Sequence, residues 1–186
     1  MKNIFSQITL TFLCLVLFSV LYPLAVTGIA QFAPNNGKGE IIKVNGNIVG
    51  FQKVGQSFSS NKYFWGRPSA VNYNAAGSGG SNKCTSNPDY LIEVQARIDS
   101  FLVYHSYLQK HDIPAEMVTA SGSGLDPNIS PKSALIQVKR IAVNRNLSEQ
   151  KLTNFVNTFI QKPFMGIFGT PTVNVLQLNV ALDNYK

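Results

Sequence analysis

Residues 3–37 carry no charged side chain, and this feature constrains the chain more than any other. Within them, the 23 residues from Ile8 to Ala30 read ITLTFLCLVLFSVLYPLAVTGIA and are almost entirely apolar. As an α-helix this run measures about 34 Å, and the hydrocarbon core of a bilayer is about 30 Å thick. Helices of soluble proteins rarely stay apolar on every face over such a length. The run predicts a transmembrane helix over residues 8–30, preceded by a short N-terminal segment, residues 1–7.

A cleaved signal peptide is the alternative interpretation, since Gly28-Ile29-Ala30 resembles a cleavage site between small residues. The apolar core of a signal peptide usually has about 7–15 residues, so the longer run here favours an anchor that stays attached. Pro23 removes one backbone hydrogen bond from the helix, and Gly28 permits another helix to approach closely. Both residues favour membrane helices of partner proteins as neighbours. The few flanking charges leave the orientation of the helix open.

Residues 31–186 are numerous enough for one further domain. Apolar residues at 41–44 and 47–54 flank Asn45-Gly46, the dipeptide that most strongly indicates a tight β-hairpin. The apolar residues that begin at Val173 recur near period two, which predicts a strand at the start of this stretch and leaves its end open. Together with the helices between them, these elements predict an α+β domain.

Three helices are expected between the hairpin and the last strand. Asn87, Pro88 and Asp89 form a helix start, with a cap, a proline and an acidic residue in the first turn. The second helix begins at Ser130 and the third at Ser148, and a long loop, residues 67–88, precedes all three. The first helix has an apolar stripe that we expect to face the core, at Leu91, Val94, Ile98, Phe101, Leu102, His105 and Leu108.

Composition excludes several classes of function. Only 13% of the residues are charged, against about 25% in ordinary soluble domains. The net charge is +7, but the basic residues are scattered and form no stripe for nucleic acid. His105 and His111 lack the neighbours of a metal site. The phosphate-binding and dinucleotide-binding glycine motifs are absent, and Ser-x-x-Lys at Ser59 and Ser148 lacks the other motifs of a penicillin-binding enzyme.

Two segments are unusual and predict an interface with a partner. Residues 63–70, YFWGRPSA, place three aromatic side chains beside an arginine, a combination that interfaces favour. The edge of a core, with Arg67 holding a carboxylate or a carbonyl, fits them equally well. Residues 119–131 form a tight loop whose amides could bind an anion, although local capping by Asp126 and Ser130 is the commoner arrangement. The residues predicted for the interface are Tyr63, Phe64, Trp65, Arg67, Ser121, Ser123 and Asp126.

These segments carry a resemblance to a known family. The chain resembles the C subunit of the bacterial high-affinity potassium-transporting P-type ATPase, the Kdp complex. The resemblance covers nearly the whole chain, and its motifs keep their order. They are YFWGRPSA (63–70), YN (73–74), SGGSN (78–82), NP (87–88), VTASGSGLDPNISP (118–131), residues 137–140, residues 146–148 and VNVLQLNVALD (173–183).

The resemblance implies an accessory subunit that is not itself an enzyme and binds no cofactor tightly. Its expected partners are a potassium-selective, channel-like subunit, a P-type catalytic subunit, a small membrane subunit and the membrane itself, with no nucleic acid. The family's C subunit is needed for assembly and activity, and it has been proposed to act as a chaperone that raises the ATP affinity of the catalytic subunit. The expected location is the bacterial inner membrane, with a single span and the large domain, residues 31–186, outside the cytoplasm.

Gln137 is the candidate for contact with ATP inside the complex, because a glutamine amide can hydrogen-bond a nucleotide. The same amide could equally face solvent. The implied topology places the large domain outside and ATP inside, so we favour indirect coupling through the conformational states of the pump. Two other classes stay open: a tethered binding module with its ligand in the loop of residues 67–88, and an anchored cell-wall enzyme that uses Ser59 or Ser123.

Overall fold

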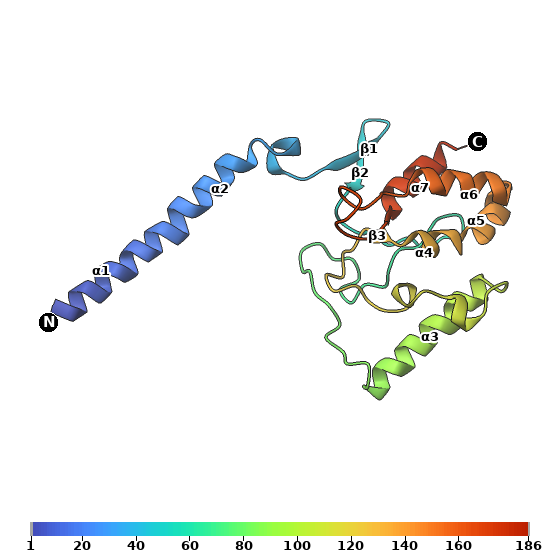
Figure 1. The fold of residues 1–186 in the computed structure, drawn as a ribbon, viewed down its shortest axis with the longest axis horizontal. Helices are drawn as coiled ribbons and strands as arrows, with labels where there is room; N and C mark the ends of the chain where they lie inside the picture. Colours follow the sequence, from blue (N-terminus) through green and yellow to red (C-terminus); the bar gives the residue numbers. More distant parts are fainter. Residues whose placement is uncertain (1, 186) are drawn as a thin grey trace. The chain divides into compact units, whose positions relative to one another are not determined.

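The computed structural model describes residues 2–185 and divides the chain into two units, one that ends at Ile41 and one that begins at Ile42 (Figure 1). The first unit is a continuous helix built from α1 (Lys2–Val16), a π-helical turn (Leu17–Leu21) and α2 (Tyr22–Ala30). The 28 residues from Asn3 to Ala30 are long and apolar enough to cross a membrane, and the mean hydropathy of their 18-residue window is 2.3. The helix already begins within residues 1–7, at Lys2.

The π-helical turn ends two residues before Pro23 and accommodates it. Proline has no N–H, and its ring crowds the carbonyl four residues earlier, which belongs here to Ser19. In the wider turn the Tyr22 N–H donates to the Leu17 carbonyl, five residues back. The helix therefore adjusts to the proline through its own backbone.

The predicted hairpin is confirmed. β1 (Ile41–Val44) and β2 (Asn47–Phe51) form a two-stranded sheet. Asn45 has a φ of 50° and Gly46 a φ of 83°, as a type I′ turn requires. β2 ends at Phe51, three residues before the predicted end, because the chain turns there and the Val54 N–H donates to the Phe51 carbonyl.

The first predicted helix is α3 (Pro88–Tyr104), and Asn87 caps it by accepting from the Asp89 and Tyr90 N–H groups. Ile98 and Phe101 are buried as expected. Leu91, predicted for the core, is 53% exposed. The helix ends at Tyr104, so His105 and Leu108, which were predicted on its apolar stripe, lie after it. Short 3₁₀ turns occupy Pro34–Gly37, Lys110–Asp112 and Ala115–Met117.

The second predicted helix is interrupted. Ser130 caps α4 (Pro131–Leu135) as expected, but a separate helix, α5 (Val138–Arg145), follows. The Tyr107 hydroxyl lies in the break, donating to the Ile136 carbonyl at 2.7 Å and accepting from the Arg140 N–H at 3.3 Å. These two backbone groups would bond each other in a regular helix, and an inserted side chain is a known cause of such breaks.

The last third of the chain completes the core. α6 (Glu149–Thr158) is the third predicted helix and ends before Pro163. β3 (Asn128–Ile129) pairs antiparallel with β4 (Val173–Asn174), which is the strand predicted at Val173. The sequence left the structure after this strand undecided, and it is a helix, α7 (Val175–Asp183), capped by Asn174. The fully buried side chains come mainly from α5, α6 and α7: Ile141, Leu152, Val156, Leu178 and Leu182, with Phe64 among them. The fold class, α+β behind a long apolar helix, is as predicted.

Candidate functional site

Two buried side-chain amides hold the extended segment of residues 63–67 against the helices. The Asn179 amide of α7 accepts from the Phe64 N–H at 2.8 Å and donates to the Phe64 carbonyl at 2.9 Å. The Gln137 amide does the same for Trp65, at 2.8 and 3.2 Å. The amides act as a neighbouring strand would, since each pairs both polar groups of one peptide residue.

Gln137 uses its whole hydrogen-bonding capacity inside the protein. Its side chain is fully buried. Besides the two bonds to Trp65, its oxygen accepts from Arg140 at 2.9 Å and its nitrogen donates to the Ser133 carbonyl at 3.0 Å. An amide offers two acceptor and two donor positions, so in this conformation none remains for a nucleotide.

Arg140 is the centre of the cluster and is 4% exposed. Its guanidinium lies over the Trp65 ring, 4.1 Å from the centroid. Burial lowers the pKa of Arg140 to about 10, which leaves the group charged at neutral pH. Its donors reach neutral acceptors: the carbonyls of Asn61 at 2.7 Å and Tyr63 at 2.9 Å, the Gln137 side-chain oxygen at 2.9 Å and His105 Nε2 at 2.9 Å.

His105 is held as a neutral acceptor. Its Nε2 accepts from Arg140 Nε, so the proton lies on Nδ1, 2.8 Å from the Phe101 carbonyl. The ring is fully buried and stacks on Phe101 with centroids 4.0 Å apart. Burial, together with the charge of Arg140, lowers the pKa of His105 to about 4, although the hydrogen bond to the Phe101 carbonyl acts in the opposite direction. The imidazole thus satisfies the arginine without adding charge.

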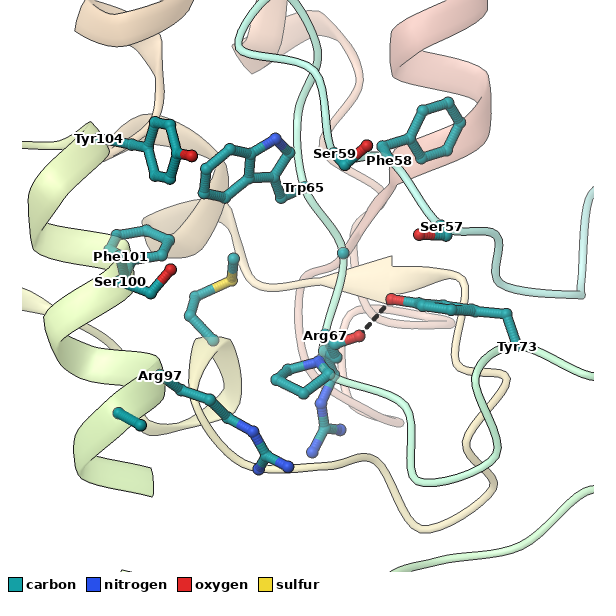
Figure 2. Close-up of a pocket in the computed structure, with 14 residues that line it drawn as sticks. Ser57, Phe58, Ser59, Trp65, Arg67, Tyr73, Arg97, Ser100, Phe101 and Tyr104 are labelled. Carbon is teal, nitrogen blue, oxygen red and sulfur yellow. Dashed lines mark hydrogen bonds between the residues drawn. The ribbon is translucent and has the colours of Figure 1, made fainter. Parts of the chain in front are cut away.

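A groove of about 500 Å³ lies on the outer side of this cluster, between residues 57–73 and the face of α3 (Figure 2). Figure 2 shows aromatic side chains at one end and arginines at the other. The Trp65 and Tyr104 rings meet edge to face at 5.2 Å. Arg97 donates to the Val118 carbonyl at 3.1 Å, and Arg67 pairs with Asp126 at 3.1 Å.

The loop of residues 67–88 and the loop of residues 119–131 are joined by hydrogen bonds near the arginine end of the groove. The Ser121 N–H donates to the Pro68 carbonyl at 3.1 Å, and the Ser69 hydroxyl donates to the Gly124 carbonyl at 2.6 Å. The Tyr73 hydroxyl donates to the Arg67 carbonyl, and burial raises the pKa of Tyr73. The loop of residues 67–88 is therefore built onto residues 121–126 at several points.

Comparison with known proteins gives the family. The family model described as the K+-transporting ATPase, c chain (KdpC) matches residues 4–184. The Potassium-transporting ATPase KdpC subunit of Flavobacterium psychrophilum is 68% identical over the full length of both chains, and that of Flavobacterium johnsoniae is 62% identical over the full length of both. The subunit of the same name from Bacteroides fragilis is 51% identical over all of this chain and 99% of its own.

The chain belongs to this family. It is a subunit of a potassium-transporting ATPase complex, and the other subunits of that complex are its partners. The apolar helix at its N-terminus is consistent with anchoring of this subunit by a single span, in which Ile8, Pro23, Gly28 and Ala30 lie along one continuous helix.

The structure brings together only part of the predicted interface. Trp65 and Arg67 line the groove, and Asp126 pairs with Arg67, which is the carboxylate contact weighed from the sequence. Phe64 and Ser121 are buried, whereas Ser123 is exposed in the loop.

Tyr63 lies away from the groove, where it borders a different depression of the surface. Its hydroxyl donates to Asp183 at 3.0 Å, and Arg145 lies 4.9 Å from the centroid of its ring. Arg97, Tyr104 and Asn179 were missed by sequence reasoning, and so were the links of Arg140 to His105. Among the motifs of the resemblance, residues 63–70, 137–140 and 173–183 supply Trp65, Arg140 and Asn179, but nothing in the sequence pointed to His105 as a member of the cluster.

Proposed function

We propose that this chain is the accessory, non-catalytic subunit of the pump, required for assembly and activity, and that it raises the ATP affinity of the P-type catalytic subunit without contacting ATP. The observation that carries the proposal is the saturated, buried amide of Gln137. A nucleotide could bond this side chain only after the Trp65 segment had left it. We therefore propose that Gln137 positions Trp65. Contact between Gln137 and ATP, which was considered from the sequence alone, stays a prediction.

The proposed coupling is thermodynamic. With the large domain outside the cytoplasm, the subunit binds one conformational state of the pump more tightly than the others. ATP is proposed to prefer the same state, so the subunit raises the affinity for ATP, and ATP raises the affinity for the subunit by the same factor because linkage is reciprocal. Coupling free energies of about 1–3 kcal/mol are usual and correspond to about 5–150-fold in affinity. The observed cluster supports this role, since it fixes one conformation of the Trp65 segment rigidly.

We further propose the groove as the surface for a partner subunit, either the channel-like or the P-type one. Its exposed Tyr104 and half-buried Trp65 are the aromatic type of side chain that dominates interface energies, and arginines flank them. A tethered module that binds a small molecule is the second candidate, because the groove volume lies within the range of ligand pockets. Tyr104→Ser should weaken recovery of the complex in a pull-down, and Val143→Ser, also exposed, should not.

A photoreactive ATP analogue applied to the assembled complex tests the absence of direct contact. We expect label on the catalytic subunit and none on this chain, in the wild type and in the exposed-residue control Gln150→Ala. Label on this chain that Gln137→Ala abolishes would overturn the proposal, provided that the variant chain still melts near the wild-type temperature. Gln137→Glu supplies a second variant if the alanine variant does not assemble.

A further inference from the structure

The turn of residues 163–169, PFMGIFG, exposes a concentration of large apolar side chains. Phe164, Met165, Ile167 and Phe168 are 74%, 75%, 78% and 63% exposed. We call this segment the apolar hairpin. Nothing within the described part of the chain covers these side chains, whereas single exposed apolar residues elsewhere in the domain are ordinary.

Four backbone hydrogen bonds form within the apolar hairpin. Phe164 and Phe168 exchange N–H to carbonyl bonds in both directions, at 2.9 and 3.0 Å. The Gly166 N–H donates to the Pro163 carbonyl and the Ile167 N–H to the Phe164 carbonyl. Met165 has a φ of 52° and Gly166 a φ of 76°, the conformation of a tight turn. These bonds lower the cost of entering lipid, because hydrocarbon offers no partner for a free peptide group.

The base of the apolar hairpin is fixed to the core. Gln161 and Thr172 exchange backbone hydrogen bonds at 2.8 and 3.1 Å, directly before β4 begins at the fully buried Val173. The exposed Lys162 stands at this base. The tip is therefore presented by a rigid support, with a positive charge placed where lipid phosphates would lie if the tip were inserted.

A short linker keeps the folded domain near the membrane that would hold the apolar helix. Only the ten residues from Gln31 to Glu40 separate the end of α2 from β1. Fully extended, such a linker spans at most about 35 Å, and a domain of this size has a radius of gyration of about 15 Å. Tethering at this distance turns membrane contact into an intramolecular event with a high effective concentration.

We propose that the apolar hairpin inserts into the interfacial region of the bilayer that holds the chain's own helix. A protein partner is the less suited occupant, because protein interfaces use about one hydrogen bond per 100–200 Å². The tip, residues 163–169, has no side chain with a nitrogen or oxygen that could form one, and four of its peptide N–H groups are already bonded within it. The insertion gives the tethered domain a second attachment point, which fixes its orientation on the membrane. The inference rests on the membrane anchor and is independent of how ATP affinity is coupled.

The test uses the assembled complex in lipid nanodiscs. Cys14→Ala and Cys84→Ser remove the native thiols, both of which are exposed, and Ile167→Cys then carries an environment-sensitive fluorophore. The matched control is Val103→Cys on α3, since Val103 is 76% exposed and also apolar. We expect blue-shifted emission at position 167, with loss of emission when nitroxide-labelled lipids are present. The label at position 103 should show neither effect.

Water-like emission at position 167, or blue-shifted emission that nitroxide lipids do not quench, would overturn the proposal. A photoreactive amino acid at position 167 identifies the alternative occupant. Cross-links to another subunit in place of lipid would assign the apolar hairpin to a protein interface. Because ATPase activity enters none of these readouts, failure here leaves the proposed function untouched.

Discussion

The cluster around Arg140 and the apolar hairpin both depart from the usual burial of apolar residues and exposure of polar ones. The cluster buries polar groups, and the apolar hairpin exposes apolar ones. The cluster places a guanidinium, an imidazole and two amides inside the domain, and pairs them with each other and with backbone carbonyls. The apolar hairpin places four large hydrophobic side chains outside and leaves them uncovered. The first region is complete within this chain, whereas the second needs its surroundings. Substitutions in the two regions should therefore affect different properties: stability in the first, attachment in the second.

The largest effect on stability is expected for Arg140→Met. The change leaves the partly buried carbonyls of Asn61 and Tyr63 and the buried acceptor nitrogen of His105 without a donor. A buried group stranded in this way costs about 1–3 kcal/mol, so we expect a total loss of about 3–5 kcal/mol in the free energy of unfolding. Chemical denaturation of the full chain in detergent measures it.

The neighbour Lys139 provides the control, because it is exposed and its ammonium group lies over the Tyr107 ring. Lys139→Met should cost at most about 1 kcal/mol, the value of an exposed cation–π contact. Equal losses in the two variants would show that the buried cluster does not stabilise the fold.

The next largest loss of stability is expected at Asn179, whose side-chain amide bonds the Phe64 backbone. Asn179→Leu removes both bonds to Phe64 and leaves one buried N–H and one carbonyl unpaired, which should cost about 2–4 kcal/mol. It should also loosen residues 63–67, measurable as faster hydrogen exchange there than in α6. Asn184→Leu, at an exposed position of the same C-terminal segment, should change neither quantity.

The pH dependence of stability sharpens the comparison further. The folded-state pKa of His105, about 4, lies below its ordinary value near 6.5, so the unfolded chain binds the proton more tightly. Stability should therefore be complete above about pH 6.5 and fall by up to about 3 kcal/mol as the pH drops to about 4. His105→Gln should remove this component of the pH profile. His111→Gln, whose side chain is exposed, should retain it.

The smallest effect on stability belongs to the apolar hairpin. Phe164→Ser with Phe168→Ser should leave the free energy of unfolding within about 0.5 kcal/mol of the wild type, as for exposed positions in general. The same pair should reduce the lipid quenching of a probe placed at Ile167. A large loss of stability would show that the two rings support the core, and the contrast between the regions would disappear.

Local chemistry made much of the fold predictable. The Asn45-Gly46 turn and the caps at Asn87 and Ser130 depend on residues within three positions of each other. The length of the apolar run likewise specified the first helix without reference to anything else. The structure of residues 175–183 could not be decided from the sequence, because their apolar residues fit a period of two nearly as well as a helical period. In the structure, the helical spacing buries Val175, Leu178 and Leu182 on one face of α7.

Long-range contacts escaped prediction. The break between α4 and α5 comes from Tyr107, about 30 residues earlier in the chain, and the neutral state of His105 from Arg140, 35 residues later. Leu91 has the right spacing for the core, but the packed face of α3 is narrower than its apolar stripe. For the site, sequence reasoning selected Trp65, Arg67 and Gln137, while the groove itself depends on how α3 packs. Their roles toward partners and ATP remain predictions.

The π-helical turn before Pro23 has a consequence for how the anchor meets other helices. A regular α-helix advances about 100° per residue, and a π-turn accommodates one extra residue. The side chains of α2 are therefore rotated by about 100° from the positions that the spacing of α1 would extrapolate. A partner helix packed along the whole anchor would therefore contact one set of positions in α1 and a set shifted by one residue in α2. A cysteine cross-linking scan along the anchor should accordingly lose its periodicity at residues 17–21 and resume it with a shifted phase.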